Sequence, residues 1–491
     1  MTVRLRLRRA RHSIVLWSAA LALAGGAVVT SSASPAAAAG TGPCDIYASN
    51  GTPCVAAHST TRALSGAYSG RLYQVRRSSD GATTDVGTLS AGGFANAATQ
   101  DSFCANTSCV ITIIYDQSGR GNNLTQAPAG GAAGGPDNLA DAKALPVTAG
   151  GHKVYGVFVA PGTGYRNDAT NGIATGSASQ GEYMVAAGGH VNSGCCFDYG
   201  NAESNARDNG NGHMGAVYFG KLCWFGFVVP GQCVGAGPWV MADLENGLFA
   251  GANGTNTNNT GNSSTFVTGM VKNNSTTYAI KDANANSGGL KTDYNGPLPT
   301  TSGYTPLRLE GGIILGIGGD NSKGSAGSFF EGVMTTGMPN DAAENAVQAN
   351  ITSVGYAMGA VTGATGPIVA GDNSSSCVDN NNASATPGNK VQMFTCNGNT
   401  AAQNWTVASD GTVQIDGGCL DITGANSANG TLIEWWTCNS GGNQQWQAVN
   451  GQLVNPATGK CLDDPGANTA NGTQLILWAC NGGSNQQWHL P

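Results

Sequence analysis

The C-terminal part of the chain contains one sequence unit three times. The units carry cysteine pairs of identical spacing, 19 positions apart, and successive pairs begin 42 positions apart: Cys377/Cys396, Cys419/Cys438 and Cys461/Cys480. Each unit opens with Cys-x-Asp and closes with Gln-x-Trp. A unit of this length cannot bury a hydrophobic core by itself, so the three units must share one. The repeat therefore predicts a single C-terminal domain made of three units.

Eight further cysteines lie in the N-terminal part, and in an exported chain they indicate disulfides. Three pairs are close in sequence, and each can close a short loop: Cys44/Cys54, Cys104/Cys109 and Cys223/Cys233. The adjacent Cys195 and Cys196 then remain. In one arrangement they bond to each other. In the alternative each pairs elsewhere, which requires the local pairs to be reshuffled.

A basic and then apolar segment opens the chain. Five arginines from Arg4 to Arg11 precede an apolar run from Ile14 to Val29, and the small-residue stretch Pro35–Ala39 follows. This layout is that of a secretory signal peptide, which we expect at residues 1–39. A membrane anchor is the alternative, but the run contains two glycines and is short for a span of ~20 residues. We therefore expect a secreted, extracellular protein.

Charge limits the partners of the mature chain. Removal of residues 1–39 takes away five of the 22 Lys+Arg and none of the 29 Asp+Glu, so the net charge moves from −7 to −12. An acidic surface disfavours nucleic acid and anionic membranes as partners and is compatible with a neutral polysaccharide. Charged residues are only 10% of the chain and turn-forming residues are abundant, which favours many short strands. The composition predicts an all-β fold.

Two domains are expected after the signal peptide. The N-terminal domain covers residues 42–358, a linker covers 359–371, and the C-terminal domain covers 372–491. Alternating segments such as Val110–Tyr115 predict that the N-terminal domain is a β-sandwich. One helix is expected near its end, capped by Asn340 and stopped at Gly355.

The candidate chemistry of the N-terminal domain rests on carboxyl groups. The sequence contains no phosphate loop, no zinc-spaced His/Cys set and no Gly-x-Ser-x-Gly elbow, whereas glycoside hydrolysis needs two carboxyl groups. The segment Trp239–Phe249 has the pattern of a strand, and strand alternation would place Asp243 and Glu245 on one face. Asp320 follows a glycine-rich run, which predicts a carboxyl group at a loop tip. A structural acid is the alternative for each.

Several motifs in this domain resemble glycoside hydrolase family 54. They are Gly42–Tyr47, Gly194–Glu203, Gly210–Met214, Met241–Asn246 and Gly316–Ser322. The resemblance implies a retaining α-L-arabinofuranosidase with a β-sandwich catalytic domain. It assigns Glu245 as the nucleophile and Asp320 as the general acid/base.

The same resemblance implies the sugar contacts. Asp243 and Asn246 match substrate-binding positions, the backbone at Gly319 approaches the sugar, and Trp224 walls the pocket or is a core residue. A disulfide between Cys195 and Cys196 packs against the sugar ring in the family. Two features depart from its pattern. Gly247 stands where a second Asn is common, and the Cys223/Cys233 pair is additional.

The threefold repeat resembles the ricin-type β-trefoil of carbohydrate-binding module family 13. In such modules a pocket combines the Asp after the first Cys, an aromatic residue before the second Cys and a polar residue beyond it. The second and third units have this set complete: Asp421, Trp436 and Asn443, and Asp463, Trp478 and Asn485. The first unit has Asp379 and Phe394 but Ala402 at the third position, so we expect weak binding there. We expect the Gln-x-Trp tryptophans in the core.

The leading hypothesis is a monomeric exo-acting hydrolase, without metal or organic cofactor, that trims arabinofuranosyl groups from arabinoxylan or arabinan. One alternative is a two-domain lectin whose sandwich is inactive; the presence of both Glu245 and Asp320 argues against it. The other is hydrolysis of a different glycoside, such as an internal arabinan linkage.

Overall fold

The structure is a computed structural model that describes Met1 and most of the chain from Gly40 onward. The described ranges are 40–223, 233–252, 254–300, 304–358, 365–408, 411–439, 441–449 and 451–491. The predicted signal peptide, Trp224 and the first part of the predicted linker lie outside the described residues. Within the described ranges, no helix combines the length and apolarity needed to cross a bilayer.

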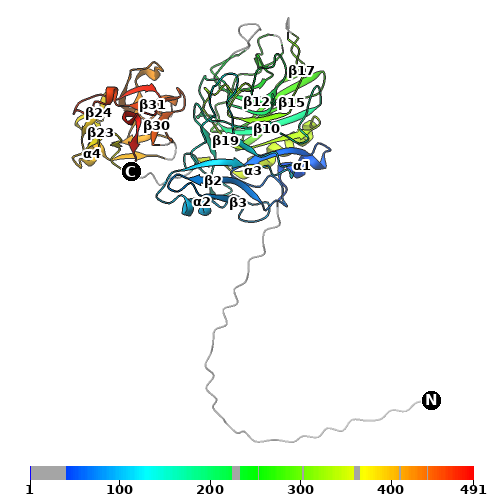
Figure 1. The fold of residues 1–491 in the computed structure, drawn as a ribbon, viewed down its shortest axis with the longest axis horizontal. Coiled ribbons are helices and arrows are strands. Elements are labelled where there is room, and N and C mark those ends of the chain that lie inside the picture. The colour runs from blue at the N-terminus through cyan, green and yellow to red at the C-terminus, as the bar shows by residue number, and fades with distance from the viewer. Residues whose placement is uncertain are drawn as a thin grey trace. The chain divides into compact units, whose positions relative to one another are not determined.

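The N-terminal domain contains two large antiparallel sheets, as the all-β prediction requires (Figure 1). Among the described residues, sheet one has the order β1-β19-β10-β15-β16-β17, and β8 also pairs with β19. Its strands are β1 (Cys54–Ser59), β8 (Val157–Val159), β10 (Gln180–Ala187), β15 (Phe266–Asn273), β16 (Thr277–Asn284), β17 (Ser287–Pro297) and β19 (Gly327–Thr336).

Sheet two has the order β14-β13-β12-β11-β18-β9-β5-β4-β2-β3 over the described residues. Its strands are β2 (Arg71–Arg77), β3 (Thr83–Gly87), β4 (Cys109–Ile114), β5 (Leu124–Gln126), β9 (Tyr165–Asn167), β11 (Asp198–Ala202), β12 (Gly215–Gly220), β13 (Trp239–Asp243), β14 (Leu248–Phe249) and β18 (Gly312–Leu315). The predicted strand at Val110–Tyr115 is therefore confirmed as β4. A small sheet combines β6 (Pro146–Ala149), β7 (His152–Tyr155) and β20 (Ala357–Met358).

The two large sheets pack face to face, with β10 and β15 against β11, β12 and β13. Because strand side chains alternate, sheet two has one face in the shared core and one outer face. Tyr199, Val217 and Val240 belong to the core between the sheets. Ala216 and Met241 belong to small apolar clusters on the outer face. This outer face carries the site described below.

The helix expected near the end of the domain is confirmed as α3 (Asp341–Val354). The Asn340 side chain accepts a hydrogen bond from the Ala343 N–H (2.8 Å), and Gly355 ends the helix with φ 61°. Lys272 and Lys281, from adjacent strands of sheet one, both form ion pairs of 2.6–2.7 Å with Asp341 and Glu344. These pairs anchor the first turn of α3. The other helices of the described domain are α1 (Pro43–Ser49) and α2 (Ala97–Phe103).

The eight cysteines of the N-terminal domain form four disulfides. The local pairs are Cys44–Cys54, Cys104–Cys109 and Cys223–Cys233, and Cys195 and Cys196 are bonded to each other. The alternative, in which Cys195 and Cys196 each pair with a cysteine elsewhere, does not occur.

The six cysteines of the repeats form three more disulfides, each of which joins the two ends of one repeat, 19 positions apart. The bonds are Cys377–Cys396, Cys419–Cys438 and Cys461–Cys480. The first cysteine of each pair is fully buried, whereas the second lies nearer the surface: Cys396 is half-buried, and Cys438 and Cys480 are exposed. None of the six lines the pocket described in the next subsection, so their role in the described structure is to close the repeats.

The C-terminal domain is a trefoil in which each repeat contributes a central hairpin closed by its disulfide. The three hairpins are β23 (Ser376–Asn380) with β24 (Asn389–Thr395), β27 (Gly418–Ile422) with β28 (Thr431–Thr437), and β31 (Lys460–Asp463) with β32 (Ile476–Ala479). The other strands are β21 (Thr365–Gly366), β22 (Val369–Ala370), β25 (Trp405–Val407), β26 (Val413–Ile415), β29 (Gln447–Val449), β30 (Gln452–Asn455) and β33 (Trp488–His489). Short helices are α4 (Thr400–Gln403), η1 (Asn381–Ala383), η2 (Thr423–Ala425), η3 (Gly442–Gln444), η4 (Pro465–Ala467) and η5 (Ser484–Gln486).

The Gln-x-Trp tryptophans lie in the trefoil core, as predicted. Trp405, Trp446 and Trp488 belong to one apolar cluster that draws on all three repeats. Each donates its indole N–H to a backbone carbonyl of its own repeat at 2.8–3.2 Å. The repeat therefore shares one core, as its length requires.

One buried ion pair ties sheet one to the rest of the sandwich core. The Arg62 guanidinium donates to both oxygens of Glu331, at 2.5 and 2.7 Å. Tyr183 and Tyr356 donate their hydroxyl groups to the same carboxylate. Four donors thus satisfy the carboxyl group of Glu331, which is fully buried.

We predict that Arg62→Met destabilises the N-terminal domain by about 3–5 kcal/mol, because it leaves a buried carboxylate without its cation. The double variant Arg62→Met/Glu331→Leu should lose less, because no charge then remains buried. Urea unfolding of both variants measures the difference. A double variant less stable than Arg62→Met would contradict this account.

Candidate active site

A pocket of about 360 Å³ opens on the outer face of sheet two. It contains seven of the residues that the sequence singled out: Cys195, Cys196, Asp243, Glu245, Asn246, Gly319 and Asp320. These come from the segment before β11, the end of β13 and the loop after β18. The strands β18, β11, β12 and β13 are neighbours in sheet two, so segments distant in sequence meet at one place.

The segment Trp239–Phe249 is a hairpin, which corrects the prediction of one continuous strand. β13 ends at Asp243, and the chain returns as β14 after a turn in which the Leu244 N–H donates to Gly247 O (3.2 Å). Glu245 and Asn246 occupy the centre of the turn, with φ 62° and 54°. Two positive φ values are those of a type I′ turn, a conformation that rarely accepts Glu. Strand alternation therefore predicts the orientation of the Asp243 side chain, whereas the turn determines that of Glu245.

The Glu245 carboxyl group accepts two backbone hydrogen bonds. The Asn209 N–H donates to one oxygen at 3.1 Å, and the His213 N–H donates to the other at 2.6 Å. In addition, the Glu245 N–H donates to Asp243 Oδ1 at 3.0 Å. The loop before β12 and the end of β13 thus fix the same side chain from two sides.

Glu203, which follows β11, faces Glu245 across a hydrogen bond between their carboxyl groups. Burial raises the pKa of Glu203 to about 7, and burial together with Glu203 raises the pKa of Glu245. The pair therefore holds one proton near neutral pH. Both oxygens of Glu245 already accept N–H groups, whereas Glu203 Oε2 has no partner among the described residues. The two N–H groups stabilise the ionised form of Glu245, which is the form that a nucleophilic carboxylate needs.

Asp320 lies in the loop after β18. The Ser322 N–H donates to its Oδ1 at 2.9 Å, which orients the carboxyl group. A Cβ at the preceding Gly319 would overlap the carboxyl group of Glu203, so one of the two would have to move. Arg166, buried beneath the loop, donates to Gly319 O (2.6 Å) and to Glu203 O. One guanidinium thus fixes the loop of Asp320 to the end of β11.

The disulfide between Cys195 and Cys196 lines the same pocket. It packs against the loop after β18, since the Gly324 N–H donates to Cys195 O (2.8 Å) and Cys195 Sγ lies 3.7 Å from Ser322 Oγ. The additional disulfide Cys223–Cys233 lies beside Leu222, which also lines the pocket. Trp224 lies outside the described residues, so its predicted wall position is not tested.

Sequence reasoning missed several pocket residues: Glu203, Asp208, Met214, Leu222, Gly318 and Ser322. Glu203, Met214, Gly318 and Ser322 belong to motifs that carried the family resemblance, so that signal was present. Asp208 carried none. It lies beside Asn246, whose side-chain amide donates to Asp208 Oδ1 at 3.4 Å.

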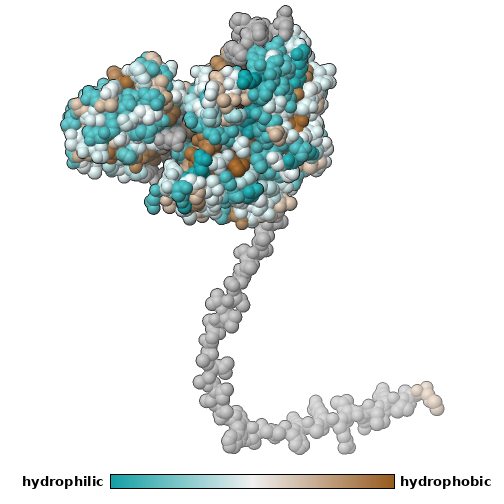
Figure 2. Space-filling view, viewed as in Figure 1, coloured by the Kyte–Doolittle hydropathy of each residue, from teal (hydrophilic) through white to brown (hydrophobic). Residues whose placement is uncertain are grey.

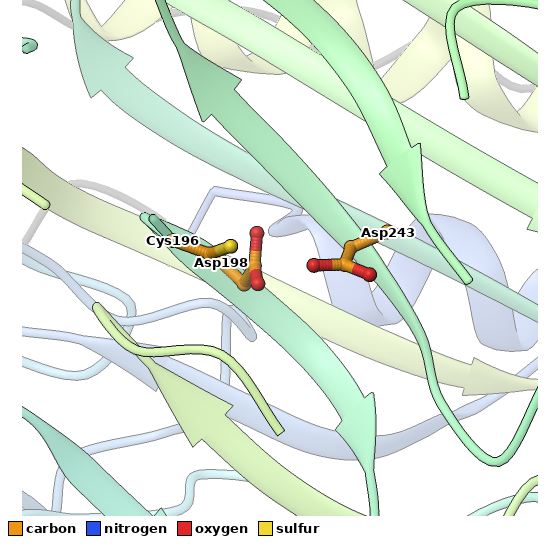
Figure 3. A group of neighbouring side chains, drawn as sticks. All are labelled: Cys196, Asp198 and Asp243. Carbon is orange, nitrogen blue, oxygen red and sulfur yellow. The ribbon is translucent and has the colours of Figure 1, made fainter. Parts of the chain in front are cut away.

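Beneath the pocket, Asp198 faces Asp243. Figure 3 shows the two carboxyl groups pointing toward each other, with Cys196 beside Asp198. Ligand atoms of all three residues lie within 4.8 Å of one another. Cys196 is bonded to Cys195, however, so its sulfur is not a thiolate. Two carboxyl groups are too few for a protein-built cation site, and we assign no metal here.

The trefoil contains two matching clusters of polar side chains. Asp421 Oδ2 accepts hydrogen bonds from Asn443 (2.8 Å) and Gln444 (2.6 Å), and its other oxygen accepts none from the described residues. Trp436, two residues before the second cysteine of that repeat, is 40% exposed.

The third repeat has the same arrangement. Asp463 Oδ2 accepts from Asn485 (3.0 Å) and Gln486 (2.7 Å), and Trp478 is also 40% exposed. In both repeats an exposed indole lies on the same hairpin as a carboxylate that is held in place on one side.

The first repeat differs. Gln392 donates to Asp379 Oδ1 (3.1 Å) and Gln403 donates to its Oδ2 (3.0 Å), so both oxygens are occupied. Phe394 replaces the tryptophan and is only partly exposed, and Ala402 is buried. The first repeat therefore lacks the free carboxylate oxygen of the other two.

The comparisons with known proteins follow the same division. Residues 43–357 match the family described as "Alpha-L-arabinofuranosidase B, catalytic", and residues 364–488 match the ricin-type beta-trefoil lectin domain. The probable alpha-L-arabinofuranosidase B of Aspergillus terreus is 61% identical over 329 residues, which are 65% of this chain and 63% of that protein. The alpha-L-arabinofuranosidase of Hypocrea jecorina is 60% identical over 326 residues, 65% and 64% of the two chains.

Solved structures of glycoside hydrolase family 54 are also similar. An arabinofuranosidase complexed with arabinofuranosyl-alpha-1,2-xylobiose has a TM-score of 0.71 and 39% identity, over 92% of this chain and 99% of that one. A family member soaked with a cyclic sulfate inhibitor has a TM-score of 0.71 and 38% identity, with the same coverage. This chain spans about 63% of the length of the curated relative from Aspergillus terreus. With residues 43–357 matched, the chain belongs to the alpha-L-arabinofuranosidase B catalytic family, glycoside hydrolase family 54.

Proposed function

We propose that this protein is a secreted, retaining exo-α-L-arabinofuranosidase that removes terminal arabinofuranosyl groups from arabinoxylan or arabinan. The observation that carries the proposal is the pocket itself. Glu245, Asp320 and the Cys195–Cys196 disulfide line one cavity of about 360 Å³, a size suited to a single sugar residue. The relatives named above are arabinofuranosidases, and one was solved with an arabinofuranosyl ligand.

The reaction proceeds by double displacement. Glu245, ionised and held by two backbone N–H groups, attacks the anomeric carbon while Asp320 protonates the leaving oxygen. Asp320 then removes a proton from water, which releases the sugar with retained configuration. In the reacting state the proton that the pair shares is on Glu203, because a second charge beside Glu245 would oppose its ionised form.

Asp243, Asn246 and the backbone at Gly319 supply the hydrogen bonds to the sugar hydroxyl groups in this proposal. The disulfide provides an apolar surface for the ring, and Trp224 completes the wall. Gly247 offers no side-chain amide, so a hydroxyl contact supplied by a second Asn would be absent.

The trefoil directs the enzyme to its polymer. An exposed indole stacks on a sugar face, and the free oxygen of Asp421 or Asp463 accepts hydrogen bonds from its hydroxyl groups. We place the catalytic domain at residues 42–358, the linker at 359–371 and the binding module at 372–491. The face in Figure 2 is mainly hydrophilic with scattered apolar residues, consistent with an extracellular monomer that binds neutral polysaccharide.

Glu245→Gln should lower kcat by at least roughly 10⁴-fold, because an amide cannot act as the nucleophile. Asp320→Asn should lower it by roughly 10²–10⁴-fold, as expected for loss of a general acid/base. Release of the chromophore from an aryl α-L-arabinofuranoside measures both. NMR of the first-formed anomer checks retention in the wild type.

Both variants should unfold at the wild-type temperature within a few degrees, since each change is isosteric. Substantial activity in Glu245→Gln, or a first-formed product of inverted configuration, would refute the assigned mechanism.

Gly319→Ala tests the packing of the acid/base loop. The added Cβ overlaps the Glu203 carboxyl group, so either that group or the Asp320 loop must move. A displacement of ~1 Å at a reacting group costs on the order of 10²-fold in rate, and we expect a loss of that size in kcat/KM. Gly131→Ala is the matched control, because a Cβ at that position meets only ordinary contacts of 3.6 Å or more. Equal activity of the two variants would contradict the close packing.

Trp436→Ala and Trp478→Ala should each weaken retention on insoluble arabinoxylan, and the double variant should nearly abolish it. Each pocket is weak alone, whereas two pockets on one chain gain from effective concentration on a polymer. Phe394→Ala is the control, because the carboxylate of the first repeat is already occupied. Sedimentation with the polymer measures binding, and hydrolysis of the small aryl substrate should not change. The division of roles fails if Phe394→Ala causes the largest loss.

A further inference from the structure

We propose that Asp198 is a positioning residue of the active site: it is a neutral acid whose carboxyl O–H donates to Asp243 and holds Asp243 ionised and correctly aimed. This inference rests on the proposed function, because Asp243 is one of the residues assigned to the sugar. Asp198 itself does not line the pocket.

The sheet register brings the two acids together. Asp198 begins β11, Asp243 ends β13, and β12 lies between them, with Asp198 opposite Tyr218 and Asp243 opposite Ala216. Positions 216 and 218 share a face of β12, so both acids point to the outer face of sheet two. Figure 3 shows their carboxyl groups turned toward each other from strands that are not neighbours. Asp198 is 0% exposed.

The surroundings of Asp198 offer no hydrogen-bond donor. Neither of its oxygens receives an N–H or O–H from another described residue. The ionisable groups that act on it are acids, namely Asp243, Glu203 and Glu182. Tyr218, the other titratable neighbour, donates no hydrogen bond to it. A buried carboxylate without donor or cation is strongly disfavoured, so Asp198 must be protonated.

The proton belongs to Asp198 rather than to Asp243. Asp243 Oδ1 accepts the Glu245 N–H, and Asp243 borders the pocket, where water and sugar hydroxyl groups reach it. Asp198 has neither a described backbone N–H donor nor a position at the pocket. Burial and the neighbouring Asp243 raise the pKa of Asp198 well above its ordinary value, whereas the pKa of Asp243 rises only to about 7, mainly through burial.

A short chain of hydrogen bonds follows from this assignment. Asp198 donates to Asp243, and Asp243 accepts from the backbone of Glu245 in the type I′ turn. The orientation of Glu245, the nucleophile, therefore depends on the proton of Asp198, which acts through Asp243. Loss of that proton would place two facing carboxylates under the sugar and release the turn.

Two variants separate the donor from the packing. Asp198→Asn keeps the size and supplies a permanent N–H donor, so kcat/KM on an aryl α-L-arabinofuranoside should stay within about threefold of wild type. Asp198→Leu removes the donor, and kcat/KM should fall roughly 10- to 100-fold. Asp293→Asn is the control: its carboxyl group is buried in sheet one and its pKa is also raised to about 7. It should leave activity unchanged.

Infrared difference spectroscopy of wild type against Asp198→Asn provides a readout independent of activity. The difference spectrum at pH 8 should contain the carbonyl band of one buried protonated carboxyl group that is present in the wild type and absent from Asp198→Asn. If the wild type released no arabinose, the proposed function would fail while this band still tested the proton. The positioning role is overturned if the band is unchanged in Asp198→Asn. It is equally overturned if Asp198→Asn, folded with a wild-type Tm, is as inactive as a folded Asp198→Leu. If Asp198→Leu does not fold, the positioning role is tested by the kcat/KM and the infrared carbonyl band of Asp198→Asn.

Discussion

The site depends on the way in which a cluster of buried carboxyl groups is neutralised. Elsewhere in the sandwich, two buried acids are balanced by cations: Glu331 by Arg62, and Glu344 by Lys272 and Lys281. Around the pocket, no Lys or Arg of the described residues forms an ion pair with Asp198, Glu203, Asp243 or Glu245. Protons therefore take the place of cations there. A cation would hold the pKa of its partner low, whereas shared protons leave several carboxyl groups poised near neutrality, which acid–base chemistry requires.

The site also requires unusual backbone geometry at two positions. Glu245 stands in a left-handed turn that Glu rarely adopts, and its side chain is held there by two N–H groups from the loop before β12. Gly319 stands where any side chain would collide with Glu203. Neither local conformation is favourable alone. Each persists because sheet two fixes the segments on both sides, so the scaffold stabilises a strained arrangement at the reacting groups.

Much of this arrangement could be predicted from the sequence, and the failures have physical causes. The repeat predicted the shared trefoil core around Trp405, Trp446 and Trp488, because its spacing and length leave few alternatives. Asn340 and Gly355 marked α3 through local hydrogen bonding and left-handed backbone. The continuous strand at Trp239–Phe249 was wrong, since its alternation continues through Leu244 although the chain reverses at Glu245. Asp198 and Glu203 both belong to the motif Gly194–Glu203, but the motif pattern alone does not show their roles, because these depend on which groups surround each carboxyl group. Those surroundings arise only when β11, β12 and β13 are side by side.

The disulfides have a consequence for how such a chain can be altered. Every bond lies within one domain, and the longest joins cysteines only 19 positions apart. No bond joins a cysteine before the linker to one after it. Recombination at the linker therefore leaves no orphaned thiol in either fragment, and a whole lectin unit can be exchanged for another without redesigning the oxidative pairing of the hydrolase. The disulfides themselves therefore place no covalent constraint between the sandwich and the trefoil.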